Sequence, residues 1–281
     1  MSAATETAMT PTTGPVHLRP GFDAAMRHST HAPLALLDRD PGFYRCIGDI
    51  PTYALGVLAL YLHSTDRLYH RGLQEAARDL FSAGRASAIL ARMQSAGLIV
   101  PADAFQRGRQ RRYVPAPAMV QAFRACYRIE LESLALIDPR VVPMVAAYDR
   151  SDVFDRIVAF LAGRHLAAPA LDQELIDPLG GVGRRSMGLM CAYALAEAAF
   201  ADGRTSPEGP VAVNTSALAR RLGVSRTHVR RVLATLKDAG LIAGGPSSDR
   251  LVLTPAFAEG YTLYFYGMFS VLLAAVGCME T

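Results

Sequence analysis

Arginine and hydroxyl side chains crowded into one short stretch are the residues of this chain best suited to chemistry. Residues 225–231 read SRTHVRR and contain three arginines and no acidic side chain. Arginine binds phosphate and the acceptor edge of guanine, and Ser, Thr and His form hydrogen bonds with bases or phosphates. This composition points to contact with DNA, and a solvated basic face on an ordinary helical hairpin is the alternative. The candidate DNA-binding residues are Ser225, Arg226, Thr227, His228, Arg230 and Arg231.

Two short helices are predicted to position these side chains. The first begins near the cap at 214–216, and the turn follows at 223–224. Ser225 caps the second helix and Gly240 ends it. Apolar residues of the second helix recur at i, i+3, i+4 and i+7 and form one buried face, made of Val229, Val232, Leu233 and Leu236. The arginines lie on or near the opposite face, where they could reach base edges in the major groove.

A strand hairpin is expected after the second helix. Residues 241–243 and 251–253 are apolar and flank a turn of Gly, Pro, Ser and Asp residues at 244–249. The order of elements from 214 to 254 resembles the winged-helix DNA-binding domains of bacterial transcription regulators, including the MarR-like group. The resemblance covers about forty residues. It implies that the helix at 225–239 enters the major groove and that Arg250 belongs to the wing.

The first half of the chain repeats this pattern. Residues 82–99 read SAGRASAILARMQSAGLI and align with SRTHVRRVLATLKDAGLI at 225–242. Further matches occur upstream and downstream, at offsets that change only where loops are expected. Each copy is interpreted as an entry helix, a further helix, a helix-turn-helix, a wing and a long exit helix. MarR-like subunits have this order and pair through interlocked entry and exit helices, so the resemblance implies a covalent pseudo-dimer.

The expected fold is therefore mainly α with small β-wings. Two winged-helix repeats form a pseudo-two-fold dimer through their entry and exit helices. We expect a disordered tail at 1–20, a first repeat at 21–140 and a second repeat at 141–281. The segment at about 168–185 is interpreted as a loop inserted in the second copy.

The two copies differ on their outer faces. The first helix has Gly, Ser and Ala where the second has Thr and two Arg, and its remaining candidates for DNA binding are Arg85, Ser87 and Arg92. The wings show the opposite asymmetry, because residues 106–113 read QRGRQRRY with no acidic neighbour, whereas the second wing has only Arg250. The candidates of the first wing are Arg107, Arg109, Arg111 and Arg112. We hypothesise that the second copy reads bases while the first wing holds the backbone; a solvated charged hairpin is the alternative for 106–113.

Residues 261–279 form an apolar stretch of nineteen positions without a charged side chain. Its length permits a membrane span, but a buried interface helix is favoured because no cluster of basic residues flanks it. A second copy of the chain could cover this helix in a homodimer. Its aromatic residues either fill the core or, as the resemblance implies, line a pocket for a small aromatic effector: Tyr261, Tyr264, Phe265, Tyr266 and Phe269.

Composition bears on the other function classes. The net charge of +4 favours anionic partners, and four cysteines without CxxC spacing suggest neither a zinc knuckle nor a disulfide framework. The N-terminal stretch has neither the basic nor the apolar region of a signal peptide, so a cytoplasmic location is expected. His28 and His31 have no evident third ligand. We expect no metal, no cofactor and no enzymatic activity.

These patterns predict a sequence-specific transcription regulator that binds double-stranded DNA. A plasmid replication initiator with tandem winged helices is one alternative. A winged-helix protein-interaction adaptor is another, and the basic helix at 225–239 argues against it for the second copy but not for the first.

Overall fold

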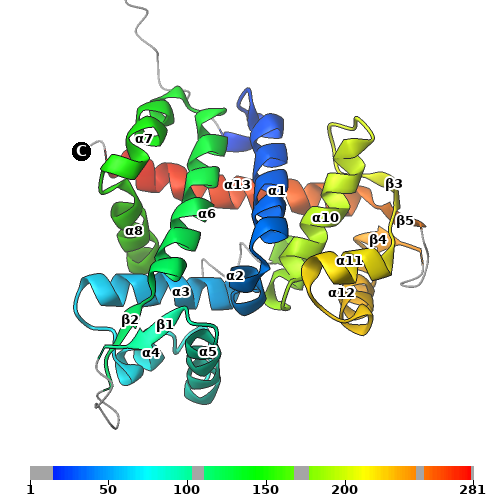
Figure 1. The fold of residues 1–281 in the computed structure, drawn as a ribbon. Helices are drawn as coiled ribbons and strands as arrows, with labels where there is room; N and C mark the ends of the chain where they lie inside the picture. The colour runs from blue at the N-terminus through cyan, green and yellow to red at the C-terminus, as the bar shows by residue number, and fades with distance from the viewer. Residues whose placement is uncertain (1–14, 103–110, 168–176, 245–249, 280–281) are drawn as a thin grey trace, which may run out of the picture.

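The computed structural model of the chain describes residues 15–102, 111–167, 177–244 and 250–279. This part of the chain is mainly helical and contains two small antiparallel sheets, which agrees with the expectation of a mainly α fold with small β elements (Figure 1).

The first half begins and ends with its longest helices, α1 and α6, and places shorter helices and a hairpin between them. Its elements are η1 (Val16–Leu18), α1 (Phe22–Arg39), α2 (Pro41–Cys46), α3 (Ile50–Ser64), α4 (His70–Ala76), α5 (Ala83–Ser95), β1 (Ile99–Pro101), β2 (Tyr113–Pro115) and α6 (Pro117–Ala135). Side-chain caps set the helix starts. The Asp49 carboxylate accepts a backbone hydrogen bond at 2.8 Å at the start of α3. The Ser82 hydroxyl accepts one at 3.3 Å at the start of α5. Strands β1 and β2 pair antiparallel.

The second half follows the same order and adds one strand. Its elements, with the connection, are η2 (Pro139–Val141), α7 (Val142–Ala147), η3 (Tyr148–Arg150), α8 (Val153–Ala167), η4 (Asp177–Leu179), η5 (Val182–Arg184), α10 (Gly188–Ala201), β3 (Gly209–Ala212), α11 (Thr215–Leu222), α12 (Arg226–Asp238), β4 (Ile242–Ala243), β5 (Arg250–Leu253) and α13 (Pro255–Gly277). The strands predicted at 241–243 and 251–253 correspond to β4 and β5. The additional strand β3 pairs with β5 in a sheet of order β3-β5-β4. Its register places Val211 opposite Leu251, and both are buried.

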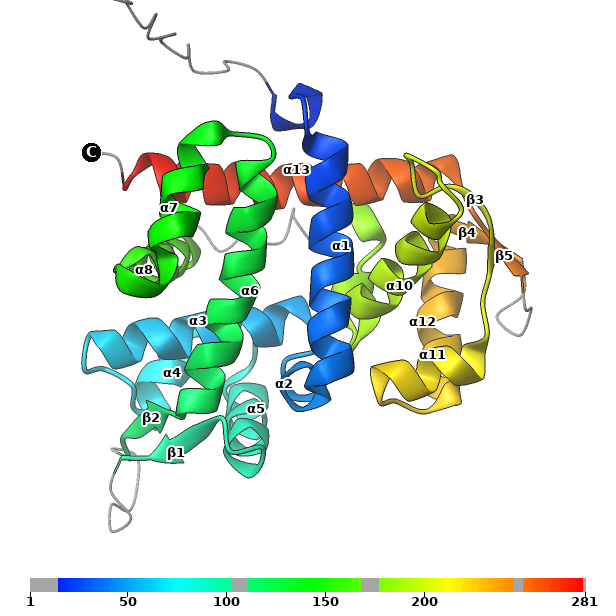
Figure 2. The same ribbon diagram turned by 45° about the horizontal axis from the view of Figure 1, so that its top comes forward.

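The centre of the molecule is built from helices that the two halves share. Helix α1 packs against α6 of its own half and α10 of the other, while α8 packs against α13 of its own half and α3 of the other (Figures 1 and 2). Buried contacts join α1 to α13. The Thr30 and Tyr261 hydroxyls are 2.7 Å apart, and the rings of Phe22 and Phe269 meet edge to face at 5.8 Å. One hydrophobic core therefore extends through both halves.

Two segments expected to be a tail and a loop contribute to this core. In the expected tail at 1–20, Val16 is buried and Arg19 donates a hydrogen bond to the Asp138 carboxylate at 3.4 Å. In the expected insertion at 168–185, Leu179 and Val182 are buried, and η5 contacts α3, α10 and α12. The described parts of both segments therefore differ from the expectation. Each has too few apolar side chains to produce a periodic pattern.

Helix α13 is the apolar helix expected near the end of the chain. It is long and apolar enough to cross a membrane. Its aromatic residues Tyr261, Phe265 and Phe269 are nevertheless fully buried, and the helix runs through the middle of the molecule behind α1 and α6 (Figure 1). Tyr266 is partly exposed and meets His17 edge to face at 5.0 Å. Burial of these turns inside the chain fits the absence of charged side chains from residue 261 to the end of the helix.

Candidate nucleic-acid interface

Helices α11 and α12 are joined by a tight turn, as the sequence predicts. The Asn214 side chain accepts a backbone hydrogen bond at 2.8 Å at the start of α11, and the Ser225 hydroxyl accepts one at 3.1 Å at the start of α12. Gly223 lies between them with a φ of 66°, a left-handed conformation that favours glycine. Gly240, with a φ of 72°, follows the end of α12. The predicted caps and turn are confirmed.

One face of α12 is buried and the other carries exposed arginines. The predicted apolar face is at most 1% exposed at each of Val229, Val232, Leu233 and Leu236. Burial of this face fixes the rotation of the helix about its axis. The exposed side chains are Arg226, Thr227, Arg230 and Arg231. Among the described residues, no acidic side chain pairs with these three arginines. Their positive charge is therefore available to an anion.

His228 does not belong to this exposed face. Its Nε2 donates a hydrogen bond to the backbone carbonyl of Ser186 at 2.7 Å, and its ring is half-buried. The contact joins the first turn of α12 to the segment that precedes α10. His228 thus positions the helix in this structure, whereas the sequence suggested a DNA contact.

Arg221 joins α11 to the helices behind it. Its Nε and Nη2 donate to the two carboxylate oxygens of Asp38 on α1, each at 2.9 Å, and its Nη1 pairs with Glu197 on α10. The hydrogen bonds to Asp38, and to a smaller extent those to Glu197, raise the pKa of Arg221 above its ordinary value. The guanidinium is therefore held by two carboxylates of the chain rather than available to DNA. Sequence reasoning did not select this residue.

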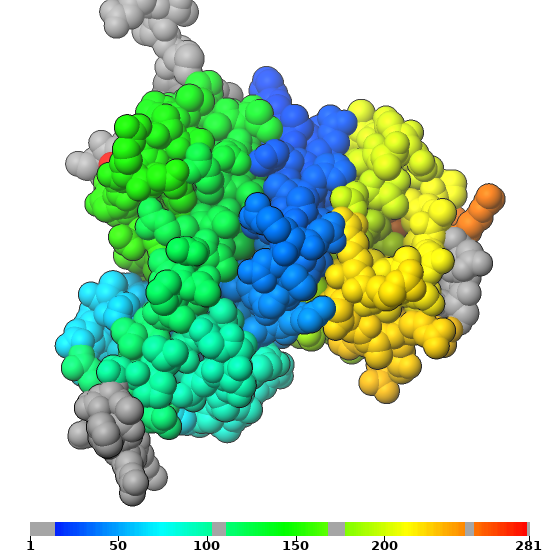
Figure 3. Space-filling model, viewed as in Figure 1, coloured from blue at the N-terminus to red at the C-terminus, as the bar shows by residue number. Residues whose placement is uncertain are grey.

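Two further exposed arginines extend the basic surface. Arg220 lies on α11 and is exposed. Arg45 comes from α2 in the first half, and a β-carbon added to Gly223 would overlap its guanidinium, so it lies directly against the turn between α11 and α12. Figure 3 shows the blue segment of α1 and α2 in contact with the yellow segment of α11. The sequence analysis missed Arg45 because only the tertiary fold brings it to this turn.

Helix α5 of the first half offers fewer groups to a nucleic acid. Arg85 and Arg92 are exposed, as the sequence suggests. Ser87 is different, because its hydroxyl accepts a hydrogen bond from Gln74 Nε2 at 2.8 Å, lies 3.0 Å from His70 Nε2 and donates to a backbone carbonyl at 3.0 Å. These contacts use the hydrogen-bonding capacity of the hydroxyl. Ser87 therefore supports the fold rather than presenting a group to a base.

The basic wing of the first half is described only in part. Of its four candidates, Arg107 and Arg109 lie outside the described residues. The guanidinium of Arg111 lies over the Tyr113 ring, 5.8 Å from its centroid. Arg112 pairs with the carboxylate of Asp66, so the fold brings to this arginine an acidic partner that its sequence neighbours do not supply. In the other sheet, Arg250 is exposed at the start of β5.

Comparison with known proteins gives no assignment. No protein-family model, no curated protein and no solved structure matches this chain. Within the part of the chain that the structure describes, no group of three or more His, Cys, Asp or Glu side chains could hold a metal ion. Function is therefore inferred from the geometry of the surface and the interior.

Proposed function

We propose that this chain is a sequence-specific DNA-binding transcription regulator built from two winged-helix units on a pseudo-two-fold axis. The exposed face of α12 carries the proposal, because Arg226, Arg230 and Arg231 stand there without an acidic partner among the described residues. The helix pair α11 and α12, followed by the β4 and β5 hairpin, supports a winged helix in the second half.

In this proposal α12 enters the major groove of DNA. An α-helix with its side chains is about 10–12 Å across, and the groove is about 12 Å wide. Arg230 and Arg231 then contact base edges, while Arg226 and the exposed Thr227 reach bases or phosphates from the first turn. Arg45, beside the turn, contacts the phosphate backbone. Each well-placed bidentate contact with a base is worth about 1–3 kcal/mol against the wrong base.

The first half makes backbone contacts in this proposal. Helix α5 and the pair α11 and α12 lie along the same lower edge of the molecule in two views (Figures 1 and 2). One duplex could therefore run along both. Because α5 presents only Arg85 and Arg92, the first half binds phosphates and leaves base recognition to α12. The candidate wing residues Arg107 and Arg109 would add to this contact.

Selection from a random DNA pool tests base recognition. The purified chain is expected to enrich a defined motif. Arg230→Ala combined with Arg231→Ala is expected to abolish the enrichment, because the contacts with bases are lost. The matched control removes the same charge with Arg150→Ala and Arg156→Ala. Both of these residues are exposed, and they lie at or near α8, on the opposite side of the molecule from α12 (Figure 1).

Binding of the selected motif at several salt concentrations tests the contacts with the backbone. Each phosphate contact that is removed should lower the slope of log affinity against log salt by about 0.9. The Arg230 and Arg231 variant is therefore expected to lose specificity, whereas Arg45→Ala, which removes a phosphate contact, is expected to lower the slope. The control changes neither. Enrichment of no motif, with wild-type dissociation constants of only about 10⁻⁴ to 10⁻⁶ M, would contradict the proposal.

A further inference from the structure

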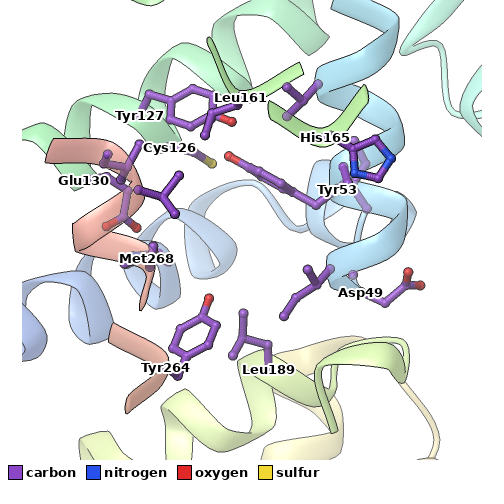
Figure 4. Close-up of a pocket in the computed structure, with 18 of the residues that line it drawn as sticks. Asp49, Tyr53, Cys126, Tyr127, Glu130, Leu161, His165, Leu189, Tyr264 and Met268 are labelled. Atoms are coloured by element: carbon purple, nitrogen blue, oxygen red, sulfur yellow. The ribbon is translucent and has the colours of Figure 1, made fainter. Parts of the chain in front are cut away.

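A cavity of about 250 Å³ lies at the centre of the molecule, where the two halves meet. Its walls come mainly from α3, α6, α8, α10 and α13, and Pro33 of α1 and Tyr44 of α2 complete them (Figure 4). Most of the lining is aliphatic and aromatic, with side chains such as Val57, Leu161, Leu189 and Met268. A concave apolar site with a few polar groups is the usual form of a small-molecule site. The polar groups therefore define which ligand would fit.

Two carboxylates line this cavity, and only one of them is committed to the fold. Asp49 caps α3 and accepts hydrogen bonds from the Thr52 backbone N–H at 2.8 Å and from its hydroxyl at 2.6 Å. Glu130 on α6 accepts one hydrogen bond, from the Ser29 hydroxyl at 2.8 Å. No ion pair between described residues includes Glu130. Burial raises the pKa of Glu130 to about 7, although Ser29 lowers it. The cavity thus holds a carboxylate without a cationic partner.

Tyrosine side chains surround the same space. Tyr53 from α3 and Tyr264 from α13 project into it, and Tyr127 lies beside Tyr53 (Figure 4). The side chain of Tyr127 is only 3% exposed, and its hydroxyl interacts with that of Tyr53. Aromatic faces attract cations.

The cationic residues of the cavity lie on a different wall from Glu130. Arg164 and His165 come from α8, and each already interacts with another group of the chain. Figure 4 places His165 across the cavity from Glu130. Burial is the only cause that raises the pKa of Glu130, and no cation lowers it. The end of the cavity near Glu130 is therefore acidic and aromatic.

We propose that this cavity binds a small hydrophobic ammonium compound. The ammonium group pairs with the Glu130 carboxylate, and the apolar body packs among the tyrosine rings and the aliphatic lining. The ligand supplies the charge that Glu130 lacks within the protein and a surface for the tyrosine faces. This assignment does not depend on DNA binding, and it is tested without DNA.

Calorimetric titration with benzyltrimethylammonium tests the proposal, because this cation keeps its charge at every pH. It is expected to bind with one-to-one stoichiometry at pH 8. Affinity is expected to fall about tenfold at pH 6, because a carboxyl with a pKa of about 7 is then mostly protonated. Glu130→Gln is expected to weaken binding at pH 8 at least tenfold and to remove the pH dependence. Glu259→Gln is the matched control, because Glu259 is exposed on α13, and its affinity is expected to equal that of the wild type.

The same variants distinguish Glu130 from the other titratable groups nearby as the cause of the pH dependence. Burial raises the pKa of Cys126 to about 12 and raises the pKa of the five lining tyrosines, so these groups stay protonated between pH 6 and 8. The groups that remain are His165 on α8, Arg164 beside it, Asp49 at the start of α3 and His28 on α1, whose Nδ1 lies 2.9 Å from the Ser133 hydroxyl. If Glu130→Gln keeps the pH dependence, one of these groups causes it and the proposal fails.

Titration with benzoate separates a cationic ligand from an anionic one. Wild type is expected to bind benzoate at least tenfold more weakly than benzyltrimethylammonium at pH 8. Preference for benzoate would assign the cavity to anions through Arg164 and His165, and would overturn the proposal. The absence of measurable binding of benzyltrimethylammonium would overturn it as well.

Discussion

Replacement of the half-buried Glu130 carboxyl by an amide should stabilise the protein at neutral and alkaline pH. Burial raises the pKa of Glu130 from an ordinary value of 4.5 to about 7. The folded chain therefore holds this proton more tightly than the unfolded chain does. The resulting stabilisation is fully present below pH 4.5 and is lost as the pH rises to 7. Above pH 7 the ionised carboxylate costs about 3 kcal/mol, from a difference of about 2.5 pKa units at 1.36 kcal/mol each.

Glutamine keeps the shape of the side chain and still accepts the hydrogen bond from Ser29, but it has no ionised form. The free energy of unfolding of Glu130→Gln, measured by urea denaturation, should exceed that of the wild type at pH 8. Linkage with these pKa values makes the gain about 2.5 kcal/mol larger at pH 8 than at pH 5. The exposed Glu259→Gln provides the control and should change little at either pH. An equal effect of Glu130→Gln at both pH values would refute the argument that Glu130 is ionised at a cost.

Three more predictions concern the helix-turn-helix and the shared core. Gly223→Ala should destabilise the chain by about 1–2 kcal/mol, because φ is 66° there and the new methyl group meets Arg45. Ser225→Ala should cost about 1 kcal/mol through loss of the α12 cap. Each kilocalorie corresponds to about 2–4 °C in a thermal melt, and unchanged melts would contradict both. Residues 15–140 alone should show no cooperative melt, since α1 loses α10 and α13, and co-expression with 141–281 should restore it. A cooperative melt of the isolated half would show that the halves fold independently.

Local features of the helix-turn-helix could be predicted from the sequence. Asn214 and Ser225 cap helices through their own side chains, and Gly223 adopts the conformation that the turn requires. The apolar spacing of α12 identified its buried face for the same reason, because helical periodicity is a property of neighbouring residues. Strand β3 escaped prediction because its four residues, GPVA, are short and include Gly and Pro.

Long-range contacts could not be predicted. The pairing of Arg112 with Asp66 and the hydrogen bond from His228 to Ser186 join segments whose proximity depends on the whole fold. Both contacts change the roles expected from residue type alone. Most of the cavity lining escaped prediction for the same reason, because helices from both halves contribute to it. Of the C-terminal aromatic residues offered as a pocket lining, only Tyr264 lines the cavity.

The exchange of helices between halves gives the first half a role that does not depend on its own α5. Arg221 of α11 is held by Asp38 from α1 and by Glu197 from α10, so the helix-turn-helix of the second half is braced by a helix of the first. Arg45 reaches the same turn from α2. A half that presents few basic groups on α5 therefore still fixes the position of α12 and adds a cation beside it. If α12 reads bases as proposed, base recognition requires both halves, even where only one of them contacts bases.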